Sequence, residues 1–474
     1  MTAINLPRQI SVVNIGLPLF ADAIRDQGRP VAQVEWRIPA EGDPEAVAAL
    51  RRAFGTRSAA IDKANAEVVR RLDEGVPQLM GIEAAASVVP DLDDRTILHS
   101  GPPIAWPDIC DPLRRSIRAA VMAEGWASTP DQATTLIEMG SVRLEAANHH
   151  DTVVPMASAI GPGAPVYIVD NATGGTRAYS PINQGPGQVA WFGMETAPAV
   201  ERLVFLRQVA GPLLARAIEE SGPIDIFSLV AQGVQMGDDV HMRTQATNNL
   251  LIRHLLPQLM SLGGSDAQAL ARFLAGNHLF FLNIAMAGAK ALTLWAEQVD
   301  GSSVVTSMAR NGTTFGIRLA GSQAQTQEWF ITDSPPIGRA LYQSGFGPDD
   351  AAPDIGDSAV LELVGLGGPA AAASPAVAGF LGGSMADAVA ATEDMERICA
   401  GRSTRFKLPI LGFRGTPLGV DVRKVVETGI TPRINTGILH ASAGTGQIGA
   451  GVAEAPVACF REALLALSNH APAG

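Results

Sequence analysis

The stretch VERLVFLRQVAGPLLARAIEE, Val200–Glu220, has apolar residues at the three- and four-residue spacing of an amphipathic helix. A second stretch with this spacing, QATNNLLIRHLLPQLMSL, spans Gln245–Leu262. Short apolar runs separated by glycine and proline, which are typical of strands, lie on both sides of the segment that contains them. The sequence therefore predicts a mixed α/β (α+β) fold of several domains, with a helical subdomain at 197–300 in the middle of the chain.

The rest of the chain divides into three further regions. Residues 1–50 contain SVVNIG, PLFADAIRDQG and PVAQVEWRI, a strand–helix–strand pattern that predicts a small βαβ-like module. Residues 51–196 are expected to form an α/β domain. Residues 301–474 are expected to form a C-terminal α/β domain with glycine-rich loops.

The composition is that of an acidic protein able to form a large core, with 474 residues, 47% of them hydrophobic, and a formal net charge of −12. Nucleic acids and anionic membranes attract proteins through clustered Lys and Arg, and this chain has no such cluster. Neither is expected as a partner, whereas a small anion can still bind in a local basic pocket. The most apolar helical segment, His278–Ala296, contains Asn283 and Lys290, which predicts a buried core helix rather than a membrane span.

Two further features bear on the cellular compartment. The first residues lack the flanks and cleavage pattern of a signal peptide, so none is expected. The cysteines are far apart and have no CxxC spacing, which argues against a disulfide framework or a structural zinc site: they are Cys110, Cys399 and Cys459. A cytoplasmic location is therefore expected.

Candidate chemistry begins with the sequence ANHHD, where Asn148, His149 and His150 precede Asp151. Two histidines beside a carboxylate can bind a metal or transfer protons. Because adjacent residues of a strand face opposite sides, at most one histidine is expected in a given pocket, and we select His149. The alternative is a hydrogen-bonded loop without a catalytic role.

The glycine-rich stretch VDNATGGTRAYSPINQGPG, Val169–Gly187, follows an apolar strand. Backbone N–H groups in such a turn can bind an anion, and an arginine there can add a two-pronged contact. Neither a Walker nor a GxGxxG pattern is present, and a tight hairpin explains the stretch equally well. The candidate substrate-binding residues here are Asn171, Arg177 and Asn183.

The stretch MGDDVHMRTQATNN predicts a polar stripe along one face of a helix, formed by Asp238, His241, Gln245 and Asn248. Apolar sequence on both sides favours a stripe that lines a cleft, and a solvated face is the alternative. Asp238 and His241 are catalytic candidates, and Arg243, on another face, is a substrate-binding candidate. The pair Asp238 and Asp239 has a spacing that permits Mg²⁺, although no cofactor is firmly implied.

The sequence MARNGTTFGIRL contains an Asn-Gly pair at Asn311, the strongest short hairpin signal in the chain. Arg310 and Arg318 flank this turn, and two arginines there can hold a substrate carboxylate or phosphate. They can instead form ion pairs with Asp354 and Asp357 of PDIGDS.

The stretch VVETGITPRINTGILHASAGTGQIGAG, Val425–Gly451, mixes polar side chains with a run of glycines. Glycines let backbone amides approach a small polar ligand, and hydroxyl, amide and guanidinium groups stabilise charge on a reacting oxygen. The alternative is a packed turn with Thr and Asn caps. The candidates in and beside this stretch are Arg423, Thr431, Asn435, Thr436 and His440.

These stretches also carry a family resemblance. LHSGPPIAW, MGDDVHMR, ARNGTTFGIR, PDIGDSA, VVETGITPRINTGILH and GQIGAG, in this order, resemble the AllG (YlbE-like) family, which is associated with oxamate carbamoyltransferase. The resemblance covers roughly Phe54–Ser468. The first fifty residues lie outside it and resemble a short module associated with FdrA-like partner subunits.

The resemblance implies a carbamoyltransferase subunit that transfers a carbamoyl group between phosphate and the amide of oxamate. Its physiological direction would be phosphorolysis of oxalurate at the end of anaerobic allantoin use. The implied partners are carbamoyl phosphate and oxamate or another ureido acid, an FdrA-like subunit similar to acyl-CoA synthetases, an AllH-like subunit and further copies of this chain. The implied fold is mixed α/β with a small helical domain.

No catalytic residues are carried over from the family, so the roles are hypotheses from this sequence. Arg310 and Arg318 would hold substrate anions, His149 or His241 would transfer a proton, and Thr431, Asn435 and the amides of 444–451 would bind phosphate. The full substrate-binding set is Arg177, Asn171, Asn183, Arg243, Arg310, Asn311, Arg318, Arg423, Thr431, Asn435, Thr436 and His440. Two other functions stay open: a non-catalytic scaffold for the FdrA-like subunit, and a hydrolase of ureido or cyclic amide substrates.

Overall fold

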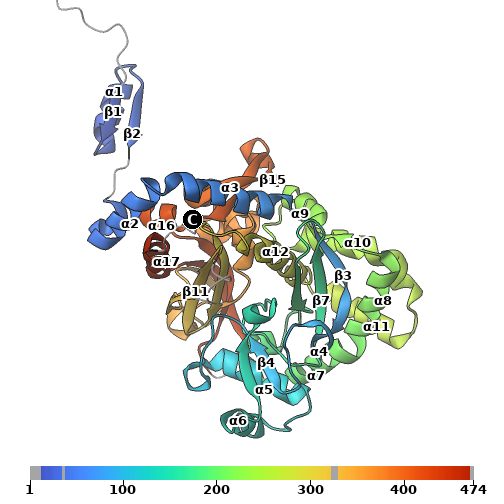
Figure 1. Cartoon of the computed structure of the whole chain (residues 1–474). Helices are drawn as coiled ribbons and strands as arrows, with labels where there is room; N and C mark the ends of the chain where they lie inside the picture. The colour runs from blue at the N-terminus through green and yellow to red at the C-terminus, as the bar shows by residue number, and fades with distance from the viewer. Residues whose placement is uncertain (1–11, 35–37, 322–328, 443, 470–474) are drawn as a thin grey trace, which may run out of the picture.

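One helix, α12 (Leu282–Glu297), runs through the middle of the molecule (Figure 1). Every residue of α12 except Trp295 is buried. The helix contacts β3 (Pro77–Ala84), β7 (Pro165–Asn171), β8 (Arg177–Pro181) and β10 (Val305–Asn311) as well as neighbouring helices, so it is enclosed on all sides. The prediction of a buried core helix in this segment is confirmed. Within the described residues, no helix is long and apolar enough to cross a membrane.

The structure is a computed structural model that describes residues 12–34, 38–321, 329–442 and 444–469. It has the mixed α/β fold that the sequence predicts, with several sheets and many helices. From α7 (Ala197–Phe205) to α12 the chain is mostly helical, and strands dominate before and after this segment. Residues 236–244, between α9 (Ile226–Gln235) and α10 (Gln245–Ser261), form a loop. The predicted helical stripe is therefore wrong for Asp238 and His241, which precede α10, while Gln245 and Asn248 lie in it.

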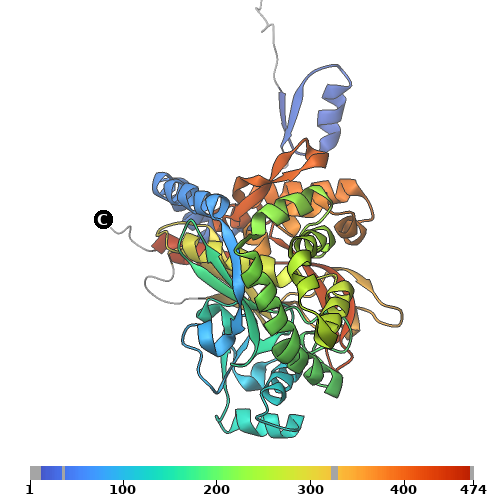
Figure 2. The same ribbon diagram turned by 90° about the vertical axis from the view of Figure 1, so that its right-hand side faces the viewer.

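A small N-terminal module stands apart from the body in both views (Figures 1 and 2). It consists of β1 (Val12–Ile15), α1 (Pro18–Arg25) and β2 (Val31–Val34), and the two strands are parallel. Pro18 lies in the first turn of α1, where its missing N–H is tolerated. These residues form a strand–helix–strand unit with parallel strands, in the order that the sequence pattern indicates.

The first half of the body contains two sheets. The larger one is antiparallel with the order β8-β7-β3-β9, formed by β3 (Pro77–Ala84), β7 (Pro165–Asn171), β8 (Arg177–Pro181) and β9 (Ile224–Asp225). The smaller one has the order β5-β4-β6, formed by β4 (Thr96–His99), β5 (Arg143–Ala146) and β6 (Ala159–Ile160). The helices here are α2 (Pro44–Phe54), α3 (Ser58–Glu74), α4 (Ala85–Val88), α5 (Asp111–Ala123), α6 (Pro130–Glu138) and the 3-10 turn η3 (Ala147–His150).

The helices that precede α12 gather on one side of the body, at the right of Figure 1 and toward the viewer in Figure 2. They are α7 (Ala197–Phe205), the π-helical turn η5 (Leu206–Ala210), α8 (Gly211–Ser221), α9 (Ile226–Gln235), α10 (Gln245–Ser261) and α11 (Gly264–Gly276). The stripe of apolar residues in α8 packs on β3, so this helical group shares a core with the larger sheet.

In its described residues, the second half of the body contains three antiparallel sheets. Their orders are β12-β11-β10-β14, β13-β18-β17 and β15-β16. The strands are β10 (Val305–Asn311), β11 (Thr314–Leu319), β12 (Phe330–Asp333), β13 (Arg339–Tyr342), β14 (Ile355–Gly356), β15 (Cys399–Leu408), β16 (Arg414–Val420), β17 (Arg433–Leu439) and β18 (Gln447–Glu454). The helices are α13 (Val360–Leu363), α14 (Pro375–Leu381), α15 (Met385–Ile398), α16 (Val422–Thr428) and α17 (Val457–Asn469).

The β10–β11 hairpin turns at Asn311 and Gly312, as the sequence predicts. Its register pairs Ser307 with Arg318 and Arg310 with Phe315. Because side chains alternate along a strand, Arg310 and Arg318 project from opposite faces of this sheet. A single ligand therefore cannot be held between them.

We expect removal of residues 1–38 to leave the melting temperature of the body within about 2 °C of that of the full chain, because the module packs mainly on itself. Calorimetry or circular dichroism would measure this. The matched contrast is Leu292→Ala in α12, which should cost about 2–5 kcal/mol because it leaves a cavity in the core. A truncated chain that melts as low as L292A would contradict the separation of the module.

Candidate functional site

A small cavity lies where the helical segment meets the parts of the chain before and after it. It is lined by Pro155, Met156, Trp191, Phe192, His241, Met242, Leu279, Leu282, Ser358, Asn435, Thr436, Gly437 and Gln447. We call it the Asn435 pocket. Its volume of about 50 Å³ holds roughly three or four water molecules. Predicted site residues from two distant stretches, His241 and the pair Asn435 and Thr436, line this one cavity.

A buried histidine–carboxylate pair forms one wall of the Asn435 pocket. His241 Nδ1 lies 2.7 Å from Glu362 Oε1, and both side chains are buried. The backbone N–H groups of Gly368 and Asn435 also donate to Glu362 Oε1, at 3.3 and 3.4 Å. A carboxylate on Nδ1 fixes the ring orientation and assigns the proton to that nitrogen. Nε2 is therefore the ring nitrogen left for a ligand.

Next to this pair, Asp239 anchors Asn435. Asn435 Nδ2 donates to Asp239 Oδ2 at 2.7 Å, and Asp239 also accepts from the N–H groups of Met242 and Arg243. Burial raises the pKa of Asp239, and these donors act in the opposite direction. The Asp239 carboxylate thus joins the helical segment to β17 at the edge of the pocket.

Asp238, unlike Asp239, forms its hydrogen bonds within the segment 238–247. Its Oδ2 accepts from Thr247 N–H at 2.7 Å and Thr247 Oγ1 at 2.9 Å, and its Oδ1 lies 3.1 Å from Arg243 Nη1. Every oxygen of Asp238 and Asp239 therefore has a donor already, and a bound Mg²⁺ would have to displace these donors. Arg243, a predicted substrate ligand, donates to Asp238, so part of its guanidinium group is already used inside the protein.

Behind the Asn435 pocket lies a fully buried ion pair. Arg310 donates to Asp354 through Nε at 2.8 Å and Nη2 at 3.0 Å, and through Nη1 to the Gly356 carbonyl at 2.6 Å. Thr436 Oγ1 donates to Asp354 Oδ1 at 2.8 Å, so the pair supports the pocket wall from behind. Because Asp354 occupies the guanidinium fork, Arg310 takes the alternative role predicted for it, an internal ion pair, and does not reach a ligand in the pocket.

Two candidates of the 169–187 stretch, Asn171 and Arg177, bond to other parts of the protein. Asn171 accepts the N–H groups of Val76 and Thr173, so it shapes the turn between β7 and β8. Arg177 lies on the surface and forms a two-pronged pair with Asp170 at 2.5 and 2.8 Å. The β7–β8 pairing confirms the hairpin alternative for this stretch.

Two asparagines that were predicted to bind substrate form hydrogen bonds within the protein instead. Asn183 Nδ2 donates to Asn283 Oδ1 of α12 at 2.9 Å, and Asn183 Oδ1 accepts the N–H of Gly185. Asn311 Oδ1 accepts the N–H of Thr314 at 2.6 Å, as an asparagine in a tight turn does. Neither residue lines the Asn435 pocket.

The remaining candidates of the C-terminal stretch lie apart from the Asn435 pocket lining. Arg423 pairs with Asp421 and Asp62 at 2.9 and 2.8 Å. Thr431 lies in the loop before β17, and His440 accepts the N–H of Ser442 at 3.1 Å.

Most of the hypothesised phosphate-binding stretch 444–451 lies in a strand, since β18 begins at Gln447. β18 is the central strand between β13 and β17, so its N–H groups belong to the sheet. A Cβ at Gly449 would lie 2.5 Å from the Leu341 carbonyl oxygen, and one at Gly451 would lie 2.2 Å from that of Arg339. The glycines are needed because the strands approach closely.

His149 and Arg318 meet at a different place, beside Trp329. Trp329 Nε1 donates to His149 Nε2 at 2.9 Å, and the Arg318 guanidinium lies 5.8 Å from the Trp329 ring centre. Burial, with Arg318 and Lys290 nearby, lowers the pKa of His149 to about 4. The predicted residues thus form two groups, one at the Asn435 pocket and one at Trp329.

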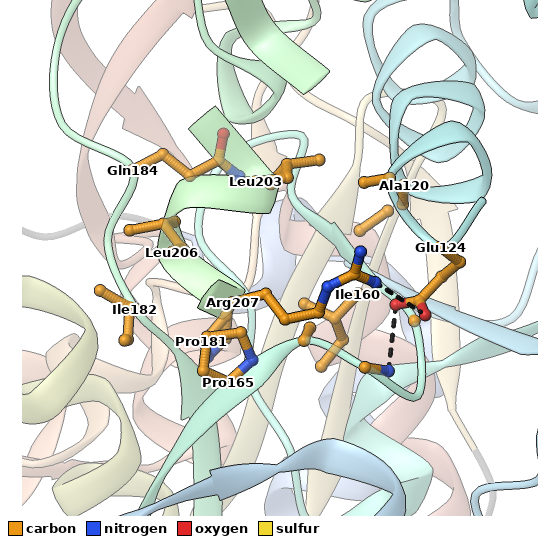
Figure 3. Close-up of a pocket in the computed structure, with 15 residues that line it drawn as sticks. Ala120, Glu124, Ile160, Pro165, Pro181, Ile182, Gln184, Leu203, Leu206 and Arg207 are labelled. Atoms are coloured by element: carbon orange, nitrogen blue, oxygen red, sulfur yellow. Dashed lines mark hydrogen bonds and ion pairs between the residues drawn. The ribbon is translucent and has the colours of Figure 1, made fainter. Parts of the chain in front are cut away.

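A second cavity, lined mainly by apolar side chains of α5, β7, α7 and η5, contains none of the predicted residues (Figure 3). Glu124 and Arg207 point toward each other there, with Glu124 Oε2 3.5 Å from Arg207 Nη1, and the Gly163 N–H donates to Glu124 at 3.0 Å. The Asn435 pocket, in contrast, has several converging polar groups, which is the usual mark of a ligand site.

Sequence reasoning did not find Glu362. It lies in the run VLELVGLGG, where it is the only charged residue among apolar residues and glycines. A carboxylate in such a run must be buried, and a buried carboxylate needs a partner, so this pattern is the signal that could have identified it.

We expect Asp354→Asn to destabilise the protein by about 3–5 kcal/mol, because it leaves Arg310 buried without a counter-charge. Arg177→Gln, which removes a surface pair, should cost no more than about 1 kcal/mol. Urea unfolding of both variants would measure the two values. Equal effects would contradict the structural role of Arg310.

Comparison with known proteins identifies relatives along nearly the whole chain. Residues 142–358 match the family of the oxamate carbamoyltransferase subunit AllG. The chain is 40% identical to the "Oxamate carbamoyltransferase subunit AllG" of Escherichia coli (strain K12) over 417 residues, 86% of this chain and 98% of that protein. It is 35% identical to the "Uncharacterized protein YahG" of the same organism over 459 residues, 96% of each chain.

A solved structure has the same fold. The crystal structure of a conserved protein of unknown function from Enterococcus faecalis V583 superposes with a TM-score of 0.83 at 35% identity, covering 86% of this chain and 97% of that one. Identity of this level over most of both chains settles the relationship, and the resemblance found in the sequence is confirmed. The chain belongs to the AllG family.

Proposed function

We propose that this chain is a subunit of a carbamoyltransferase and that the Asn435 pocket binds the reacting carbamoyl group. The reaction would be carbamoyl phosphate plus oxamate to oxalurate plus phosphate, or the reverse. Two observations support the proposal: the E. coli relative is named a subunit of that enzyme, and the pocket combines a carboxylate-oriented histidine with hydrogen-bond donors in a small cavity. We also propose that it works in the cytoplasm with FdrA-like and AllH-like subunits.

The reverse reaction requires one proton transfer and no covalent enzyme intermediate. A phosphate oxygen attacks the ureido carbonyl carbon, the carbon–nitrogen bond breaks, and the electron pair stays on the oxamate nitrogen. That nitrogen takes up a proton equivalent to the one that hydrogen phosphate loses. A histidine that accepts this proton from phosphate and delivers it to the leaving nitrogen would balance the reaction.

His241 fits this proton-transfer role. Glu362 orients the ring through Nδ1 and stabilises the imidazolium that forms when Nε2 accepts a proton. Glu362 itself is buried beneath the histidine, so it acts by positioning His241 rather than by touching the substrate.

A backbone donor is directed toward the same pocket. The Asn435 N–H leaves the edge of β17 and reaches Glu362, and alternate residues of a strand direct their N–H groups to the same edge. The Gly437 N–H is therefore directed to this edge as well, and Gly437 lines the pocket. Such a donor would stabilise the carbonyl oxygen as negative charge develops on it.

We expect His241→Asn to lower kcat about 10²- to 10⁴-fold with a small change in KM, because it removes proton transfer and keeps the shape of the pocket. The assay is phosphate-dependent cleavage of oxalurate by the complete complex. His254→Asn, a surface histidine that contacts Ser221, is the matched control and should be as active as the wild type.

This assay also separates the alternative functions. A transferase loses activity without phosphate, a hydrolase retains it, and a scaffold subunit gives a complex in which His241→Asn has no effect on kcat. Either of the last two results would reject the proposed role of the pocket.

We expect Gly437→Ala to raise KM for the carbamoyl substrate about tenfold, a loss of roughly 1.4 kcal/mol of binding. A Cβ at this position would lie 2.8 Å from Met156 Cε and 3.1 Å from Gln447 Nε2, so it occupies space in the cavity. The Met156 side chain can shift, so the melting temperature should change little. An unchanged KM would indicate that substrate does not bind beside Gly437.

A further inference from the structure

Four buried polar side chains with unused hydrogen-bonding groups meet beside α12, away from the Asn435 pocket lining. They are Asn148, Lys290, Ser307 and Arg318, and we call them the Lys290 cluster. Among these, the sequence singled out Arg318 as a site residue. Buried polar groups in folded proteins almost always have partners, so a concentration of unpartnered ones points to a missing ligand.

Lys290 is the centre of the cluster. Its side chain is 1% exposed, and its ammonium group makes one hydrogen bond within the described part of the chain, to Asn148 Oδ1 at 3.2 Å. An ammonium group has three donors, so the other two have no acceptor among these residues. Asn148 Nδ2 is also buried without an acceptor in the described chain.

Arg318 adds a second cation. Its Nη2 lies 2.8 Å from Glu297 Oε1, but the approach lacks hydrogen-bond alignment, and both Nε and Nη2 are without an acceptor among the described residues. Arg318 is 1% exposed. An arginine this deeply buried normally uses its planar fork on a carboxylate or phosphate.

Ser307 faces Arg318 across the hairpin. The two residues are register partners on β10 and β11, so their side chains share one face of the sheet. Ser307 Oγ is buried without a partner within the described segments. Trp329 and His149 lie next to Arg318 at the edge of the cluster. The Trp329 ring contacts Arg318, and Trp329 Nε1 donates to His149.

Three carboxylates also face Lys290: Glu297, Asp151 and Asp357. Burial raises the pKa of each, that of Asp357 to about 7. Asp357 is already held by the N–H groups of Gly101 and Val154, at 2.8 and 3.0 Å. The unused groups of the cluster are donors at Lys290, Asn148 Nδ2 and Arg318 Nε, and the Ser307 hydroxyl can also donate.

We propose that the Lys290 cluster binds a small oxyanion, either a carboxylate or a phosphate. Lys290 and Arg318 supply the charge, Arg318 Nε supplies a donor, and Asn148 Nδ2 and the Ser307 hydroxyl complete the set of donors. The binding site does not depend on the carbamoyl transfer proposed above, because none of these four residues lines the Asn435 pocket.

The test is direct anion binding to the full chain. Inorganic phosphate and oxamate are titrated separately against sodium chloride of equal ionic strength, which controls for charge screening. The readouts are tryptophan fluorescence, with Trp329→Phe to identify the local signal, and the rise in melting temperature that a bound ligand causes. A response to phosphate alone identifies phosphate as the ligand, and one to oxamate alone identifies a carboxylate.

Lys290→Met should weaken binding at least tenfold, and Lys63→Met, which removes a surface charge of the same type, should leave it unchanged. Lys290 makes one hydrogen bond within the described residues, and a flexible methionine can fill the space of its apolar stem, so K290M is expected to fold. Asn148→Asp is a second variant: it keeps an oxygen for Lys290 and places negative charge where the anion would sit, so binding should also fall.

Two results would overturn the proposal. One is the absence of any saturable response to phosphate and oxamate beyond that of chloride. The other is a response that persists unchanged in both folded variants, which would assign the anion to another place on the protein.

Discussion

The rest of the structure depends on α12 being enclosed on every side while carrying buried polar residues at Asn283, Lys290 and Glu297. These positions are seven residues apart, so they form one polar stripe along the helix. The stripe meets partners in three separate parts of the chain: Asn183, Asn148 and Arg318. Because each buried group requires its partner, the helix has one rotation and one axial position that satisfy all of them.

The elements that could be predicted from sequence are those with a local physical cause. The βαβ module and the hairpin at Asn311 follow from proline, glycine and Asn-Gly positions, and α12 follows from a largely apolar segment that contains only a few polar residues. The contacts between elements that are distant in the chain could not be predicted from such local signals. The opposite directions of Arg310 and Arg318 depend on strand register, which the hairpin sequence alone does not show.

The candidate site was predictable in part for the same reason. His241, Asn435 and Thr436 were selected as polar residues in unusual surroundings, and they line one cavity. The glycines of 444–451 were assigned to a ligand, whereas Gly449 and Gly451 allow strands to pack closely. Both roles require an absent Cβ, so the sequence could not distinguish them. Glu362 was missed because its partner His241 is 121 positions away in the chain.

The Asn435 pocket joins segments that are remote along the chain, because Asn435 bonds to Asp239 across 196 positions. Contacts of such long range form late during folding, after local helices and hairpins. On refolding from denaturant, helical circular dichroism should therefore recover before the pocket exists.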